Sequence, residues 1–164
     1  AMGLGAGTWA TGLKWGAGAV LVVLAFYGST LVLPLTRSVT SDLAAPAGES
    51  VWLTALILVP LRTVILEELV FRGVLWGLVQ ELSGARWALI GTAVAFGFWH
   101  VAPAMSLADR TGNHVGVTIL AVIVFTFLSG LLFGELRRRS GSVLASAAFH
   151  WATNGLGLIA AHLA

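Results

Sequence analysis

Six residues of the kinds that carry out chemistry interrupt three otherwise apolar stretches of this chain: Glu67, Glu68, Arg72, His100, His150 and Asn154. Carboxylates, imidazoles and amides are the groups that enzymes use to move protons and to stabilise developing negative charge. A charge at the centre of a bilayer costs about 2.5–3.5 kcal/mol, so a helix that only crosses a membrane has no reason to carry several. If these stretches are membrane spans, the six residues predict a functional site.

The composition is that of a membrane protein. Of the 164 residues, 58% are hydrophobic and only 10% are charged, whereas soluble domains carry about 25% charged residues. A nucleic-acid binder has basic residues clustered on a polar surface, and a net charge of only +2 does not indicate one. No nucleic-acid partner is therefore expected. The chain has no cysteine, which excludes disulfides, thiolate nucleophiles and thiolate metal ligands.

Intervals without charged residues predict where the chain crosses the bilayer. Four long ones lie between Lys14 and Arg37, between Arg86 and Asp109, between Arg110 and Glu135, and after Arg139. Each exceeds the length of about 20 residues that a spanning helix needs. The segment Val51–Gln80 is the fifth candidate, charged in its middle, with Pro60 placed to kink it. We therefore expect an all-α fold, a polytopic membrane helical bundle of about five transmembrane helices. Residues 1–50 would form an N-terminal segment with the first helix, and residues 51–164 the catalytic core.

The basic residues predict the orientation, because Lys and Arg are enriched in cytoplasmic loops. With a cytoplasmic N-terminus, most basic residues lie inside; the inner ones are Lys14, Arg86, Arg137, Arg138 and Arg139, and the outer ones are Arg37 and Arg110. The expected location is the plasma (inner) membrane, with the C-terminus outside. Small residues at Gly130 and Gly134, and along Ser140–Ala148, predict close helix packing.

The polar residues of three predicted helices fall at one depth. Glu67 precedes Glu81 by about four helical turns, and His100 follows Arg86 by about the same distance. His150 and Asn154 follow Arg139 by about three and about four turns. At about 1.5 Å per residue, all of them lie roughly 16–23 Å from the cytoplasmic helix ends. This coincidence predicts one polar chamber near the middle of the bilayer.

The two adjacent glutamates are expected to differ. Glu68 and Arg72 are one helical turn apart, so they face each other on one side of a helix and can form an ion pair. Glu67 is rotated by about 100° and has no basic residue one turn further along its own helix. Glu67 is therefore the carboxylate that can act as a general base in the chamber.

Three motifs together resemble the CPBP family of CAAX proteases and bacteriocin-processing membrane proteins, which includes the Ras-converting CAAX endoprotease. The family pattern Glu-Glu-x-x-x-Arg is matched at Glu67–Arg72, the pattern Phe-x-x-x-His at Phe96–His100, and the pattern His-x-x-x-Asn at His150–Asn154. The resemblance extends from Val51 to about Gly157.

The resemblance implies a metal-independent intramembrane glutamate peptidase without a cofactor, acting on a membrane peptide or a lipidated peptide. In this interpretation Glu67 is the general base and His100 helps to hold the attacking water. His150 and Asn154 donate to the oxyanion, while Glu68 and Arg72 form a structural ion pair.

Two alternatives remain open at this point. Glu67, His100 and His150 provide one carboxylate and two imidazoles, which is a plausible zinc set for a metal-dependent intramembrane hydrolase. A non-catalytic membrane scaffold, an immunity protein or a subunit of a membrane protein complex could also retain a buried carboxylate. Cleavage assays distinguish the scaffold from the enzymes, and metal analysis distinguishes the two kinds of enzyme.

Overall fold

The computed structural model describes residues 2–33 and 50–164, and this part of the chain is helical without any strand. The first helix is α1 (Trp9–Val32), preceded by a turn at Ala6–Thr8. After a long bent helix come α6 (Ala85–Trp99), α7 (Val101–Thr111), α8 (Val115–Ser140), α9 (Val143–Trp151) and α10 (Gly157–Leu163). The expectation of an all-α protein is confirmed.

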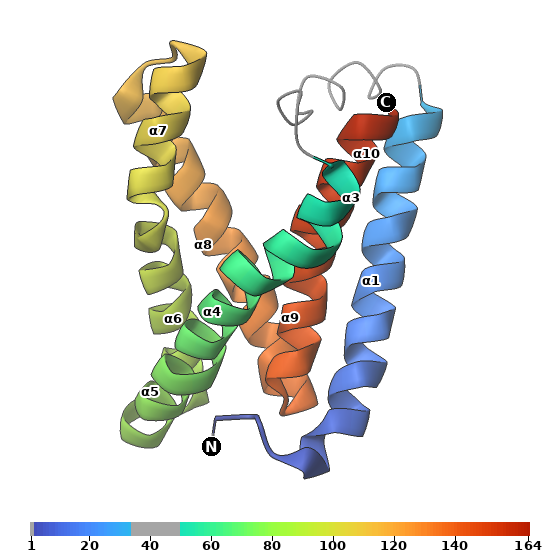
Figure 1. Ribbon diagram of the computed structural model, residues 1–164. Helices are drawn as coiled ribbons and strands as arrows, with labels where there is room; N and C mark the ends of the chain where they lie inside the picture. Colours follow the sequence, from blue (N-terminus) through green and yellow to red (C-terminus); the bar gives the residue numbers. More distant parts are fainter. Residues whose placement is uncertain (1, 34–49) are drawn as a thin grey trace.

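Four helical runs in the described residues are long and apolar enough to cross a membrane, namely Ala6–Val32, Ala85–Thr111, Val115–Ser140 and Val143–Leu163. The bent helix lies obliquely across the face of this group, and the two chain ends lie at opposite ends of the bundle (Figure 1). The predicted polytopic bundle is confirmed, with four regular spans and the bent helix as a further element.

The bent helix runs from Val51 to Ser83 and alternates between tight and wide turns. Its α-helical parts are α3 (Val51–Leu53), α4 (Ile65–Glu68) and α5 (Trp76–Ser83). The wide π-helical turns are Thr54–Leu58, Pro60–Val64 and Leu69–Leu75. Pro60, which has no N–H to donate, begins the second of these. π-Helical turns are frequent at functional sites, and the two glutamates lie in the short α-helical segment between two of them.

Small residues let the spans approach closely. A Cβ added to Gly130 of α8 would lie 3.0 Å from the Cα of Ala93 in α6, and one added to Gly16 of α1 would lie 2.9 Å from the Cβ of Ala148 in α9. Larger side chains at either glycine would push the helices apart. The close packing predicted for the Gly130–Gly134 pair and for the Ser140–Ala148 run is confirmed.

Tight reversals make consecutive spans antiparallel neighbours. Gly84, Gly112 and Gly141 take a backbone conformation with positive φ, at +84°, +68° and +71°, which glycine adopts without steric cost. At the last reversal, Ser142 caps α9 by accepting a hydrogen bond from the amide of Leu144 at 3.3 Å. These short connections bring the middles of the bent helix, α6 and α9 to a similar height (Figure 1).

The orientation can be tested at the two ends of the bundle. The start of α1, the α5–α6 turn and the end of α8 lie at one end, and the α7–α8 turn lies at the other (Figure 1). The first of these ends, which carries Lys14, Arg86 and Arg137–Arg139, is called the basic end below. Arg37 lies outside the described residues.

We predict that the basic end is cytoplasmic. The chain has no cysteine, so single cysteines at the exposed positions Ser83 and Asn113 report one end each. An impermeant maleimide should label Asn113→Cys in intact cells. It should label Ser83→Cys only after the cells are permeabilised. Ser140 is buried and is unsuitable as a reporter. The reverse labelling pattern would invert the topology.

Candidate active site

Arg72 is a fully buried cation on the bent helix. Its exposed fraction is 0%, and its Nη1 lies 3.2 Å from Glu68 Oε1. Its Nη2 donates to the carbonyl oxygen of Gly130 at 3.3 Å. The guanidinium carbon lies 4.3 Å from the ring centre of Phe96 and 5.1 Å from that of Phe133, within the range of cation–π attraction. One carboxylate, one carbonyl and aromatic faces thus replace most of the water that this charge loses, while Nε is buried and makes no hydrogen bond within the described residues.

Glu68 joins the bent helix to α9. The carboxylate is 1% exposed, and its Oε1 contacts both Arg72 and His150 Nδ1, the latter at 3.0 Å. The one-turn spacing of Glu68 and Arg72 therefore produces the expected contact, while the contact to His150 joins residues far apart in the sequence. A cation and an imidazole compensate the charge at Oε1, whereas Oε2 is buried and makes no hydrogen bond within the described residues.

His150 lies between the two glutamates. Its Nδ1 faces Glu68, and its Nε2 lies 3.8 Å from Glu67 Oε2. The ring stacks on Phe133 with centres 4.7 Å apart and planes at 22°, and Phe96 meets it edge to face. The imidazole is 3% exposed, so its orientation is fixed on both faces and at Nδ1. The separation between Nε2 and Glu67 Oε2 is too long for a hydrogen bond.

Glu67 has neighbours from two other helices, although its own helix offers it no cation. Trp99 of α6 donates its indole N–H to Glu67 Oε1 at 3.2 Å. Oε2 is buried and makes no hydrogen bond within the described residues. One carboxylate oxygen is thus held in place while the other retains its acceptor capacity. The sequence-based prediction missed Trp99, although an indole at mid-membrane depth beside His100 is an unusual position for a residue that favours interfaces.

His100 and Asn154 line a cavity beside this cluster. The cavity has a volume of about 600 Å³ and is bordered by His100, His150 and Asn154 together with Tyr27 of α1. His100 Nδ1 lies 2.8 Å from the carbonyl oxygen of Phe96, so Nδ1 is the donor, and in the neutral ring Nε2 is an acceptor. Asn154 is exposed, unlike His150. The hydroxyl of Tyr27 donates to the carbonyl of Thr153 at 2.9 Å, which ties α1 to this wall.

Arg137 supports the cluster from α8, a contact that sequence reasoning missed. Its Nε donates to the carbonyl oxygen of Arg72 at 3.1 Å, and the side chain is 4% exposed. The sequence interpretation had counted Arg137 only as an orientation signal at a helix end. The fold instead uses this cation to fasten α8 to the bent helix next to the buried ion pair.

The cluster lacks the geometry of a metal site. Over residues 2–33 and 50–164, no three His, Cys, Asp or Glu side chains lie in an arrangement that could hold a metal ion. Glu67 and His150 approach each other, but His100 does not complete a ligand set with them.

Comparison with known protein families identifies the family of the region that carries these residues. The sequence model of the family described as Type II CAAX prenyl endopeptidase Rce1-like matches residues 49–156, about two thirds of the chain. The chain belongs to this family. All three motifs, from Glu67 to Asn154, lie within the matched region. Membership in a family of membrane endopeptidases makes this protein an intramembrane protease in general terms. Searches of curated proteins and of solved structures returned no match.

We predict that Arg72→Leu lowers the free energy of unfolding by about 3–5 kcal/mol, because it leaves Glu68 charged and buried without its cation. The double variant Glu68→Gln/Arg72→Leu removes both charges and retains an acceptor for His150, so it should recover most of that loss. Arg62→Leu, at an exposed position on the same helix, is the matched control and should melt like the wild type. Thermal melts in one detergent provide the measurement. A wild-type melt for Arg72→Leu would contradict the pairing.

Proposed function

We propose that this protein is an intramembrane endopeptidase that hydrolyses a peptide bond of a membrane-associated peptide with a water activated by Glu67. The observation that carries the proposal is the buried Oε2 of Glu67, which faces His150 across 3.8 Å. His150, which faces this oxygen, also lines the cavity with His100 and Asn154, so a water that reached Oε2 would touch the base close to the cavity wall. The substrate is a membrane peptide or a lipidated peptide.

Glu67 fits the role of the base because its two oxygens have separate tasks. Trp99 holds Oε1, which fixes the plane of the carboxylate, and Oε2 can then accept the proton of the attacking water. The water oxygen bonds to the scissile carbonyl carbon, and Glu67 later passes the proton to the leaving amine nitrogen as the C–N bond breaks. A positioned base of this kind contributes about 10²–10⁴ in rate.

His150 and Asn154 fit the role of oxyanion donors. With Nδ1 donating to Glu68, Nε2 points toward the reacting centre, and it donates to an oxyanion only when the ring carries both protons. A preorganised oxyanion donor is worth about 10²–10³ in rate. His100 Nε2, an acceptor at the cavity wall, helps to hold the water.

The metal-dependent hydrolase remains the rival enzyme, and chelation tests it. We predict that activity in detergent is unchanged after exhaustive treatment with EDTA and 1,10-phenanthroline, because the proposed water is activated by a carboxylate alone. The measurement is the cleavage rate before and after chelation, together with the metal content of the same sample. Activity that is lost on chelation and restored by zinc would favour the metal mechanism.

Substitutions of the two glutamates distinguish the proposed base, Glu67, from Glu68, which belongs to the structural ion pair. We predict that Glu67→Gln reduces cleavage at least about 10²-fold and melts within about 1 kcal/mol of the wild type, since Gln retains an acceptor for Trp99 but removes the base. Glu68→Gln should destabilise the protein measurably, because it weakens the links to Arg72 and His150.

Cleavage is measured with a farnesylated peptide ending in a CAAX sequence and with its unprenylated counterpart. In cells, peptidomics of membranes that carry wild type or Glu67→Gln identifies the peptides that accumulate. An active Glu67→Gln beside an inactive, stable Glu68→Gln would assign the base to the other carboxylate. A folded wild type that changes no peptide in either assay would favour the scaffold or complex-subunit alternative.

A further inference from the structure

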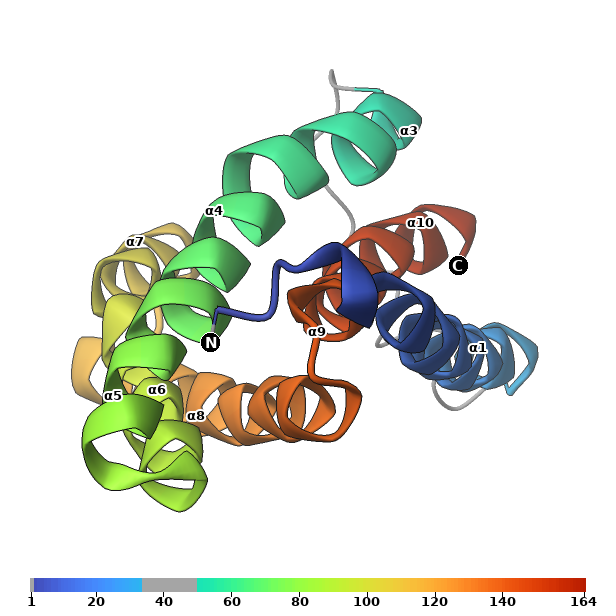
Figure 2. The same cartoon turned by 90° about the horizontal axis from the view of Figure 1, so that it is seen from below.

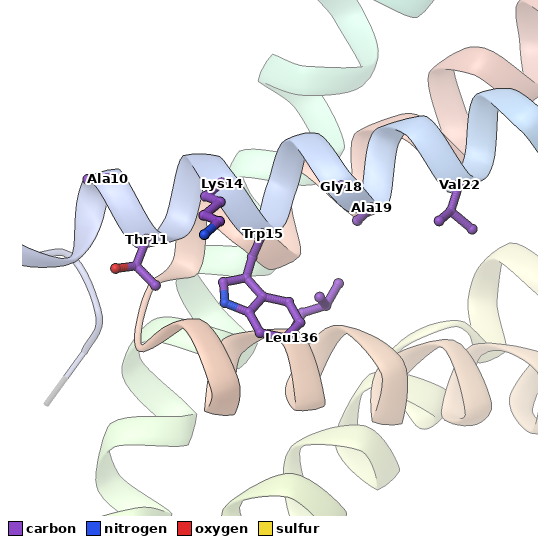
Figure 3. Close-up of a pocket in the computed structure, with 8 residues that line it drawn as sticks. All are labelled: Ala10, Thr11, Lys14, Trp15, Gly18, Ala19, Val22 and Leu136. Carbon is purple, nitrogen blue, oxygen red and sulfur yellow. The ribbon is translucent and has the colours of Figure 1, made fainter.

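One face of α1 lies against a groove and not against another helix. An adjacent face of α1 packs closely on α9, where a Cβ added to Gly16 would already touch Ala148. Toward α8, the two helices stand apart (Figure 2). The space between them is about 760 Å³ and is lined mainly by apolar residues, among them Trp15, Ala19, Val22 and Leu136. Figure 3 shows Trp15, Ala19 and Val22 pointing from α1 toward the helix that carries Leu136.

The groove continues toward the active-site cavity. A second space of about 270 Å³ shares Trp15, Ala19, Val22 and Leu136 with the first and is also lined by Leu132, Glu135, Arg139 and Phe149. Val22, Leu132 and Phe149 also line the cavity of the site. The side chains from Thr11 to Val22 cover about 16 Å of helix, which matches the roughly 15 Å depth of one leaflet of the hydrocarbon core.

The mouth of the groove, at the basic end of the bundle, carries positive charge. Lys14 lines the larger space and Arg139 the smaller one. Arg138 and Arg139 both form ion pairs with Glu135, at 2.7 and 2.6 Å, so two positive charges face this one carboxylate. Lys14 forms no ion pair within residues 2–33 and 50–164. An anionic group at this mouth would therefore be attracted, and Trp15 lies there as interfacial tryptophans do.

We propose that the α1–α8 groove binds one anionic phospholipid of the leaflet at the basic end. An acyl chain lies along Trp15, Ala19 and Val22, and the phosphate lies between Lys14 and Arg139. The end of the acyl chain reaches Val22, where the groove meets the site cavity.

Two pairs of variants test the headgroup and the chain separately. Lys14→Gln/Arg139→Gln removes the charges at the mouth, and Arg86→Gln removes an exposed charge at the same end, outside the groove. Gly18→Phe fills the groove, and Gly28→Phe adds the same ring to α1 outside it. A Cβ at either glycine meets nothing within 4 Å, so both variants should fold, which a thermal melt checks.

Native mass spectrometry of delipidated, detergent-solubilised protein provides the readout, with phosphatidylglycerol and phosphatidylcholine of identical chains as the probes. The wild type should bind one phosphatidylglycerol at least about tenfold more tightly than phosphatidylcholine, since each nearby basic residue contributes about fivefold. Lys14→Gln/Arg139→Gln should abolish this preference and Gly18→Phe should weaken binding of both lipids, while Arg86→Gln and Gly28→Phe behave like the wild type.

Three results would overturn the proposal. Equal losses of phosphatidylglycerol binding in Arg86→Gln and in the double variant would mean that the lipid is attracted to the basic end as a whole and not to the groove. Wild-type binding by Gly18→Phe would place the chain outside the groove. A wild-type dimer that Gly18→Phe dissociates would assign the groove to a second copy. The readout is lipid binding, so its outcome is independent of whether the protein cleaves peptides.

Discussion

The buried charge of Arg72 is the constraint on which the rest of the site depends. An unpaired guanidinium at this depth would cost several kcal/mol, and the fold offsets that cost with contacts from three elements. Glu68 supplies the opposite charge, Gly130 of α8 supplies a carbonyl, and Phe96 and Phe133 supply aromatic faces. These partners come from the bent helix, α6 and α8, so satisfying one cation fixes the mutual placement of three elements.

The same cluster gives two adjacent glutamates, Glu67 and Glu68, different environments. Glu68 directs its Oε1 to Arg72 and His150 and is nearly inaccessible. Glu67, one residue earlier, is held through one oxygen by Trp99 and has its other oxygen beside His150 Nε2. Two carboxylates in different environments can serve different roles, one structural and one chemical. His150 contacts both, so any change at Glu68 also reaches the proposed reaction centre.

Helix packing determines where the chamber lies and how it opens. Glycines and small residues bring α8 against α6 and α1 against α9, which closes the bundle around the cluster. The face of α1 toward α8 does not make such close contacts, and a groove remains between the two helices at the basic end. The cavity at His100 and Asn154 meets this groove at Val22, Leu132 and Phe149.

The sequence by itself determined the helical membrane fold, the three motif clusters, their common depth and the Glu68–Arg72 spacing, because hydropathy and helical periodicity are local properties. The small-residue runs likewise indicated which helices pack closely. Only the tertiary structure decided which groups meet across helices: Trp99 with Glu67, His150 with Glu68, and Arg137 with the carbonyl of Arg72. These contacts join residues far apart in the sequence, and their geometry depends on π-helical turns that rotate the bent helix about its axis. No local pattern encodes that rotation, because it results from packing one helix against several others.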